Sequence, residues 1–273
     1  MTGDWWFLTA LWALSASAIV YGARRVSPAR LDRWQARFDV ELDEVTSELV
    51  GRRLRTAGAV RWTAFAIGMN ITMLPMYMNV IEPSRAAAFN TPAVTNAFFF
   101  ATAAGAFVFE LSVRQRNADR SSNLVRRRSA DYIDPRWPRI VAALALTTLA
   151  ITIAASVQQT EEWLTAWVGV AAALLALAAC TIGVNTIVDR PSLAASGPFR
   201  AADDALRADG AHHLLGAVCA LATVGLSTSG QVLLPDFPWA LLFGLLPWVG
   251  IAWWSRLWSA EPWSVRAARR ATS

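Results

Sequence analysis

Seven long apolar stretches recur along this 273-residue chain, and they leave few other folds open to it. A helix that crosses the hydrocarbon core of a membrane needs about 20 largely apolar residues at ~1.5 Å of rise per residue. Each of the stretches comes close to that length. They cover residues 4–22, 57–81, 90–112, 139–157, 163–188, 213–229 and 238–258. We therefore predict an all-α polytopic membrane protein with about seven transmembrane helices.

The composition argues against a soluble domain of this size. Hydrophobic residues make up 55% of the chain and charged residues only 16%, whereas soluble domains carry roughly 25% charged residues. All 25 positive side chains are Arg. A basic chain could bind nucleic acid, but such high hydrophobicity favours a bilayer as the main partner, and we expect no nucleic-acid binding.

The arginines alternate along the chain in a way that predicts orientation. Four segments hold 23 Arg against 14 acidic residues, a net charge of +9; these are residues 23–56, 113–139, 189–213 and 255–273. The N-terminus and the three other connections hold one Arg and five acidic residues, a net charge of −4. Because cytoplasmic loops carry the excess of positive residues, we expect the N-terminus outside and the C-terminus inside a bacterial cytoplasmic membrane.

Tryptophan positions give an independent indication of the same orientation. Indole rings favour the boundary between membrane and water. The residues near expected outer ends are Trp5, Trp6, Trp163 and Trp239, and those near expected inner ends are Trp62, Trp137, Trp254 and Trp258. Both sets agree with the orientation that the arginines predict.

The first inner segment carries an amphipathic pattern over residues 31–50. Its apolar residues recur at three- and four-residue steps, as on one face of a helix; they are Leu31, Trp34, Phe38, Leu42, Val45 and Leu49. We predict one helix here and weigh two roles for it. The helix either lies on the inner leaflet or packs beneath the bundle, or it forms a docking surface for a cytoplasmic partner.

The second and third inner loops, 113–139 and 189–213, resemble each other weakly. Arg128 to Asp131 reads RSAD, and Arg200 to Asp203 reads RAAD 72 residues later. Parallel repeats are common in transport proteins, although so short a match in a chain rich in Ala and Arg also arises by chance. The loop residues that we single out are Asp131, Tyr132, Asp203, Asp204 and Arg207.

These loop motifs also resemble those of a known group of proteins. Residues 201–207 (AADDALR), 188–191 (VDRP), 130–133 (ADYI) and 135–137 (PRW) are similar to an uncharacterised family of polytopic membrane proteins from high-GC Gram-positive bacteria. The resemblance covers roughly residues 110–225. Genes of that family often lie near those of ATP-binding-cassette ATPases and small transcriptional regulators, which implies a transport setting. The resemblance implies no catalytic residues.

Polar side chains inside the expected spans are the other candidates for function, since such residues are costly in a membrane. Arg61 and Glu110 lie near the inner ends of the second and third spans. They either form an ion pair or reach the inner boundary separately. Asn70, Asn96 and Asn185 could line a cavity, or hydrogen-bond between helices for ~0.5–2 kcal/mol.

Motifs for catalysis are not apparent in the sequence. It contains no nucleotide-phosphate loop, no zinc-protease motif and no serine-hydrolase elbow. We therefore expect no cofactor and no metal site, and an enzyme is the least favoured of three functions. The first is a membrane subunit or accessory component of a transport system, partnered with a cytoplasmic ATP-binding-cassette ATPase. The second is a non-transporting scaffold or sensor whose inner loops bind partners, and the third is an enzyme that modifies lipid within the membrane.

Overall fold

The computed structural model describes residues 5–81, 128–158, 163–189, 198–236 and 238–259, together with Trp263 and Val265. Every regular element in these ranges is helical, as the sequence predicts. The elements are α1 (Trp5–Ala23), α2 (Pro28–Phe38), α3 (Glu44–Ile81), the 3₁₀ turn η2 (Ser129–Asp131), α5 (Arg136–Val157), α6 (Trp163–Ala178), the π-helical turn η3 (Ala179–Gly183), α7 (Val184–Val188), α8 (Pro198–Leu233) and α9 (Trp239–Ser259).

Three of the described helical segments are long and apolar enough to cross a membrane. They are Arg136–Val157, the continuous run Trp163–Val188, and Phe199–Leu233. Leu8–Ala23 and Leu241–Gly250 form shorter apolar helices. The chain is therefore a helical protein of the multi-pass membrane type. The expected span 90–112 lies outside the described residues, so the number seven remains a prediction.

Helix α8 is much longer than the span of 213–229 that hydropathy predicts. It begins at Pro198 and runs for 36 residues, about 54 Å at the usual helical rise. Pro198 is its first residue, where a proline loses no helical hydrogen bond. Hydropathy marks where a helix turns apolar and not where it begins, so the charged residues before position 213 conceal the true start.

The amphipathic segment 31–50 is divided between two helices, which differs from the single helix that we expected. Helix α2 ends at Phe38, and Asp39 adopts a left-handed conformation with φ of 53°. Asp43 then caps α3, because its carboxylate accepts hydrogen bonds from the Thr46 backbone N–H at 2.8 Å and hydroxyl at 2.6 Å. These hydrogen bonds lower the pKa of Asp43.

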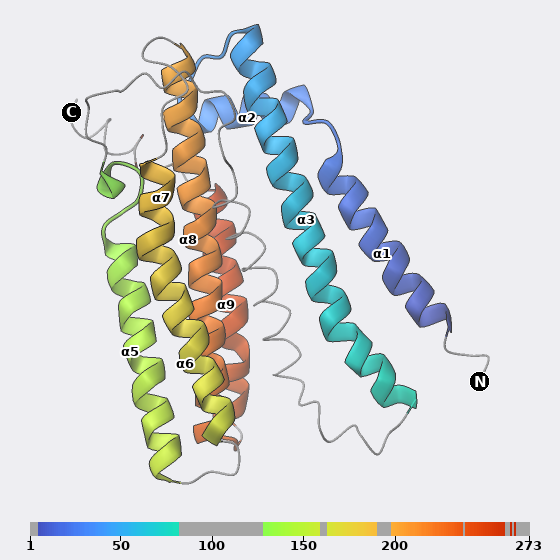
Figure 1. The fold of residues 1–273 in the computed structure, drawn as a ribbon, viewed down its shortest axis with the longest axis vertical. Helices are drawn as coiled ribbons and strands as arrows, with labels where there is room; N and C mark the ends of the chain where they lie inside the picture. The colour runs from blue at the N-terminus through green and yellow to red at the C-terminus, as the bar shows by residue number, and fades with distance from the viewer. Residues whose placement is uncertain are drawn as a thin grey trace.

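Helix α8 lies at the centre of the α5–α9 bundle, where it packs against α5, α6 and α9 (Figure 1). In its most apolar stretch 94% of the residues are buried, against 28% for the corresponding stretch of α5. Helices α1 and α3 pack against each other beside this bundle. The central position of α8 buries most of its polar residues.

Residues 214–233, which we call the small-residue half of α8, pack closely on the neighbouring helices. A Cβ atom added to Gly169 of α6 would lie 2.6 Å from the backbone oxygen of Gly225. Ser229 accepts a hydrogen bond of 2.9 Å from Thr152 of α5 and donates one of 3.0 Å to the Ala166 carbonyl of α6. Small residues and hydroxyl bonds of this kind are typical of helix contacts inside membranes.

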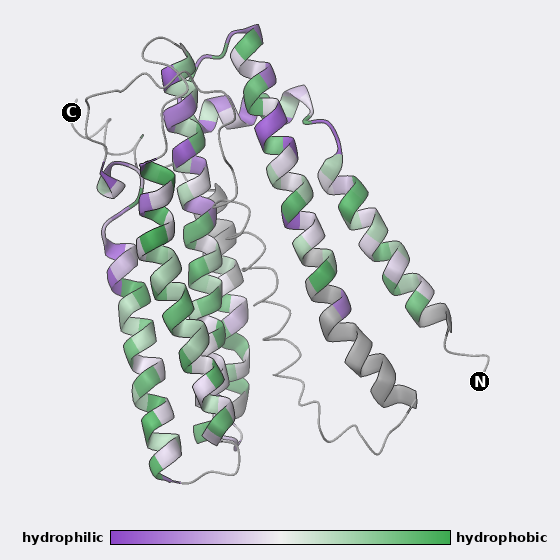
Figure 2. Cartoon of the chain, viewed as in Figure 1, coloured by the Kyte–Doolittle hydropathy of each residue, from purple (hydrophilic) through white to green (hydrophobic). Residues whose placement is uncertain are grey.

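Hydrophilic residues gather at one end of the molecule, which we call the Arg-rich end (Figure 2). It is built by α2, the start of α3, η2, the end of α7 and the start of α8, whose apolar residues share one core. Trp263 also reaches this end, where its indole N–H donates to the Ala130 carbonyl at 2.8 Å. The described parts of all four Arg-rich segments therefore meet at the same end, as the proposed orientation requires.

Candidate functional site

Residues 198–213 of α8, which we call the charged half, carry a cluster of ionisable side chains at the Arg-rich end. Its members are Asp203, Asp204, Arg207, Asp209, His212 and His213, and all except the half-buried Asp204 are buried. Charged side chains are almost never fully buried unless they are paired. The partners of this cluster therefore indicate what the site can do.

Arg207 is the largest fully buried side chain of the described residues, and it joins α8 to α7. Its Nε and Nη2 atoms donate to one carboxylate oxygen of Asp203, at 3.0 and 2.8 Å. Its Nη1 atom donates to the carbonyls of Ile187 and Val188, at 3.1 and 3.0 Å. Those carbonyls belong to the last turn of α7, where they lack partners within their own helix. Arg207 thus caps α7 while it neutralises Asp203.

Tyr132 connects the second inner loop to α8. Its hydroxyl donates to a carboxylate oxygen of Asp204 at 3.0 Å. The preceding 3₁₀ turn is closed by Asp131, whose carboxylate accepts from the Arg128 backbone N–H at 2.9 Å. The two loops with similar motifs are therefore in contact, although this contact does not test whether they arose by duplication.

Arg37 of α2 brings the first inner segment to the same helix. Its guanidinium lies 3.5 Å from the Asp209 carboxylate, and His213 Nε2 lies 3.7 Å from the same oxygen. Burial lowers the pKa of Arg37, and the nearby Asp209 partly offsets this effect. Arginine remains protonated in proteins nonetheless. A fixed positive charge on α2 therefore faces a buried carboxylate on α8.

This cluster, which we call the junction, joins three other parts of the chain to α8. Three separate parts of the chain, namely α2, the η2 loop and the end of α7, each contact α8 through a polar side chain. Among the described residues, no group of three or more His, Cys, Asp and Glu side chains is arranged to hold a metal ion. The arrangement is suited to transmit movement of a loop to α8, since buried ion pairs are costly to break one partner at a time.

Five of the six residues proposed for docking pack within the protein itself. Trp34 and Phe38 are buried in the core at the Arg-rich end, and Leu31, Leu42 and Leu49 pack against that core. Only Val45 of the six is largely exposed, at 63%. This burial favours the first role weighed for the segment, packing beneath the bundle.

The polar residues expected inside the spans lie in different surroundings. Asn70 donates to the Ser15 hydroxyl of α1 at 2.6 Å and to the Ala66 carbonyl at 2.8 Å, so it links two helices. Asn185 is exposed on α7. Arg61 is half-buried on α3, but its expected partner Glu110 lies outside the described residues, as does Asn96. The ion pair remains a prediction.

Sequence reasoning did not select Arg37, Asp209 or His213 as site residues. Asp209 and His213 are four residues apart, and such pairs share one helix face. That spacing becomes a signal only once α8 is known to begin at Pro198, because residues 198–212 otherwise look like a loop. Nothing in the sequence pairs Arg37 with Asp209, which lies 172 residues away.

No family model, no curated protein and no solved structure matches this chain. The class of the protein therefore rests on its own fold and site: a helical protein of the multi-pass membrane type with a buried charged junction at its Arg-rich end.

Proposed function

We propose that this chain is a membrane subunit or accessory component of a transport system that works with a cytoplasmic ATP-binding-cassette ATPase. In this proposal the Arg-rich end faces the cytoplasm of a bacterial cell. The observation that carries the proposal is the junction on α8. Loops that a cytoplasmic partner could reach are tied by Arg37, Tyr132 and Arg207 to the central helix of the bundle.

Coupling of this kind is what an ATP-driven system needs. A partner that shifts α2 or the η2 loop would move a buried charge relative to Asp209 or Asp204. Packed elements respond to such a shift by moving together or by repacking, because a buried charge left without its partner is costly. The movement would then reach the small-residue half of α8, most of which lies inside the expected span 213–229.

The close packing of the small-residue half favours a second candidate, a non-transporting scaffold or sensor. Gly169 and Gly225 bring α6 and α8 into backbone contact, and Gly250 of α9 lies against Ala220, whose Cα would be 2.9 Å from an added Cβ. Contacts this tight around α8 suit a protein that passes a signal between its faces.

Co-purification with quantitative mass spectrometry separates the two candidates. The tagged full chain would be isolated in mild detergent from cells that produce it naturally. We expect an ATP-binding-cassette ATPase in stoichiometric amount. Recovery of a regulator alone, or of no ATPase, would support the scaffold or sensor instead.

The junction is tested on the same complex by Arg37→Gln. We expect this substitution to lower the rate of ATP hydrolysis by the complex while the ATPase still co-purifies. Arg33→Gln is the matched control, because Arg33 lies one turn earlier on α2 with an exposed side chain. Equal hydrolysis rates for the two variants would reject the role of the junction in coupling.

Orientation is tested separately by cysteine labelling in intact cells. Asp236 and Arg33 are both exposed, and the native Cys180 and Cys219 are buried. We expect a membrane-impermeant thiol reagent to label Asp236→Cys but not Arg33→Cys. The reverse pattern would invert the proposed topology.

A further inference from the structure

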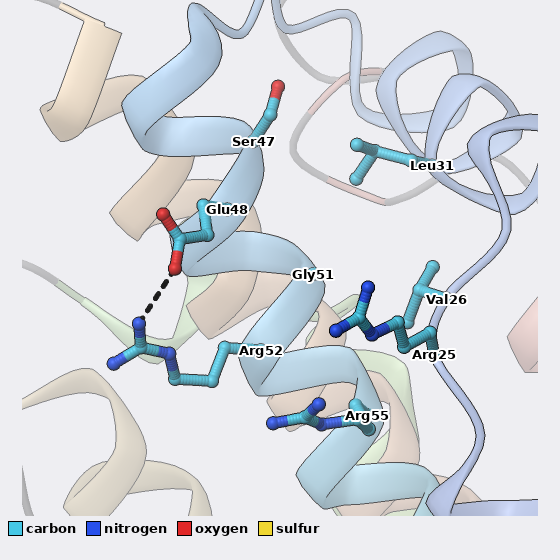
Figure 3. A pocket seen from close by; sticks show the side chains of 8 residues that line it. All are labelled: Arg25, Val26, Leu31, Ser47, Glu48, Gly51, Arg52 and Arg55. Atoms are coloured by element: carbon cyan, nitrogen blue, oxygen red, sulfur yellow. Dashed lines mark hydrogen bonds and ion pairs between the residues drawn. The ribbon is translucent and has the colours of Figure 1, made fainter.

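A pocket of about 430 Å³ opens at the Arg-rich end between the segment that follows α1 and the first turns of α3 (Figure 3). Its lining comes from three parts of the chain. The residues are Arg25 and Val26 after α1, Leu31 of α2, and Ser47, Glu48, Gly51, Arg52 and Arg55 of α3. This pocket is separate from the junction on α8, and none of its lining residues contributes an ion pair to that junction.

The pocket carries a net positive charge that the described protein does not neutralise. Glu48 is already matched by Arg52, whose Nη2 atom lies 2.9 Å from its carboxylate. Within the described ranges, Arg25 and Arg55 form no ion pair. Figure 3 shows Arg25 reaching from the segment after α1 towards α3, where Arg55 extends along the same pocket. Two guanidinium groups from different elements are therefore left for an anion.

Gly51 lines the pocket without a side chain, next to open space. A Cβ atom at this position would have no other atom within 4 Å. Ser47, one turn earlier on α3, adds a hydroxyl to the lining, and Val26 and Leu31 add apolar surface on the opposite side. The site thus combines a cationic part, open space and an apolar wall.

The position of the pocket along the chain corresponds to the expected inner ends of the first two spans, 4–22 and 57–81. Arg25 follows the end of α1 by two residues, and Arg55 precedes the expected second span by two residues. Tyr21 lies one turn before Arg25 and Trp62 lies about two turns after Arg55, and their rings make an edge-to-face contact with centroids 5.2 Å apart. Such aromatic residues are typical of the headgroup level of a bilayer.

We propose that this pocket binds the phosphate of an anionic phospholipid headgroup from the leaflet at the Arg-rich end. Guanidinium groups match the oxygens of a phosphate with paired hydrogen bonds. Anionic lipids attract basic residues placed next to a membrane span. Val26 and Leu31 offer the apolar contact that a lipid would use and that a free anion would not. Assignment to the cytoplasmic leaflet rests on the proposed topology, but the binding itself does not.

Native mass spectrometry of the purified full chain in detergent tests this site. The probes are phosphatidylglycerol, zwitterionic phosphatidylcholine and inorganic phosphate, each titrated separately. We expect one phosphatidylglycerol to bind in preference to phosphatidylcholine. The double variant Arg25→Gln/Arg55→Gln should weaken this binding by about tenfold or more. Each arginine contributes hydrogen bonds to a charged phosphate, and losing such bonds lowers the binding affinity strongly.

Two further variants distinguish an effect of the pocket itself from an effect of the overall positive charge. Gly51→Leu fills the open space next to Gly51 while every arginine is kept, so it should weaken lipid binding as the double variant does. Arg33→Gln removes an exposed arginine outside the pocket and should leave binding unchanged. Folding of each variant is checked by size-exclusion chromatography, and Gly51→Leu carries the test if the double variant aggregates.

The remaining outcomes are decisive as well. Equal binding of phosphatidylglycerol by the original chain, the double variant and Gly51→Leu would overturn the proposal. Tight binding of inorganic phosphate that displaces the lipid, and that the double variant loses, would keep the phosphate chemistry but replace the lipid by a free anion. The cysteine-labelling experiment reports on topology alone, so its failure would change the leaflet and not the site.

Discussion

The two halves of α8 contact the neighbouring elements in different ways. Both are buried at the centre of the bundle, yet the charged half contacts its neighbours through an ion pair and hydrogen bonds of charged side chains, and the small-residue half through glycines and hydroxyls. Inside hydrocarbon a charge without a partner is costly, so close backbone packing is the cheaper solution there. At the Arg-rich end, Arg37 of α2 and Tyr132 of the η2 loop supply a charged and a polar partner for carboxylates of α8. The difference teaches that one helix can be held rigidly by packing and linked to loops by charge.

The largest effect should come from Arg207→Met in the charged half. This substitution removes the guanidinium that forms an ion pair with the buried Asp203 and uncaps α7, so we expect a loss of about 3–5 kcal/mol in unfolding free energy. Titration from mild detergent into sodium dodecyl sulfate measures it. Arg33→Met, at an exposed position, should cost less than about 1 kcal/mol. Equal losses for the two variants would show that burial of Arg207 does not matter.

Gly225→Val tests the small-residue half and should have the next largest effect. A Cβ at Gly225 would lie 2.6 Å from the Gly169 backbone oxygen and 3.1 Å from the Ala173 nitrogen. Overpacking of this kind costs about 1–3 kcal/mol, measured by the same titration. The control is Gly51→Ala, where the added methyl meets open space and should stabilise α3 by roughly 0.5–1 kcal/mol. A destabilised control together with an unaffected Gly225→Val would invalidate the packing argument.

Tyr132→Phe removes one link between a loop and the charged half while the ring is kept. The lost hydrogen bond to the half-buried Asp204 should cost about 1 kcal/mol. Tyr21→Phe is the matched control, because Tyr21 is exposed on α1 and keeps its ring contact with Trp62. Hydrogen exchange should also show faster exchange at η2 in Tyr132→Phe alone. Unchanged exchange at η2 would mean that the loop is held by its apolar residues.

The smallest effect should come from Ser229→Ala in the small-residue half. It removes hydroxyl bonds to Thr152 and to the Ala166 carbonyl, and such bonds average about 0.6 kcal/mol in membrane proteins. Thr186→Val is the control, since the Thr186 hydroxyl donates to the Ile182 carbonyl in the same continuous helical run and not to a neighbouring helix among the described residues. If Ser229→Ala cost more than Arg207→Met, the contrast between the two halves of α8 would be reversed.

Sequence patterns predicted the helices better than their ends. The apolar stretches 139–157 and 163–188 fall on helices of nearly the same length, because hydropathy measures what a span requires. The break between α2 and α3 was missed because the apolar period continues across it. Both helices turn the same side towards one core, so Phe38 before the break and Leu49 after it keep the expected spacing. The left-handed Asp39 and the cap at Asp43 set the boundary.

The candidate site was predicted only in part. The loop motifs drew attention to Tyr132, Asp203, Asp204 and Arg207, and the structure places all four in or against the charged half. Their pairing was not predicted, since the sequence suggested two copies of a loop and not a contact between them. The pairing of Arg37 with Asp209 was not predicted, because a charged residue on an amphipathic helix such as α2 usually faces water.

Some properties of this protein follow from the order of its residues. Apolar length and low charge point to a helical membrane protein, and the alternating arginines indicate which segments share a side. Both properties are added up over residues that are close in the sequence. The hydrophobicity of a segment determines whether it inserts into a membrane, and the arginines of its flanking loops determine its orientation. Which charges are buried, and with which partners, was decided by the tertiary structure. An ion pair such as Arg37 with Asp209 depends on a few ångströms between distant helices, and only their packing sets that distance.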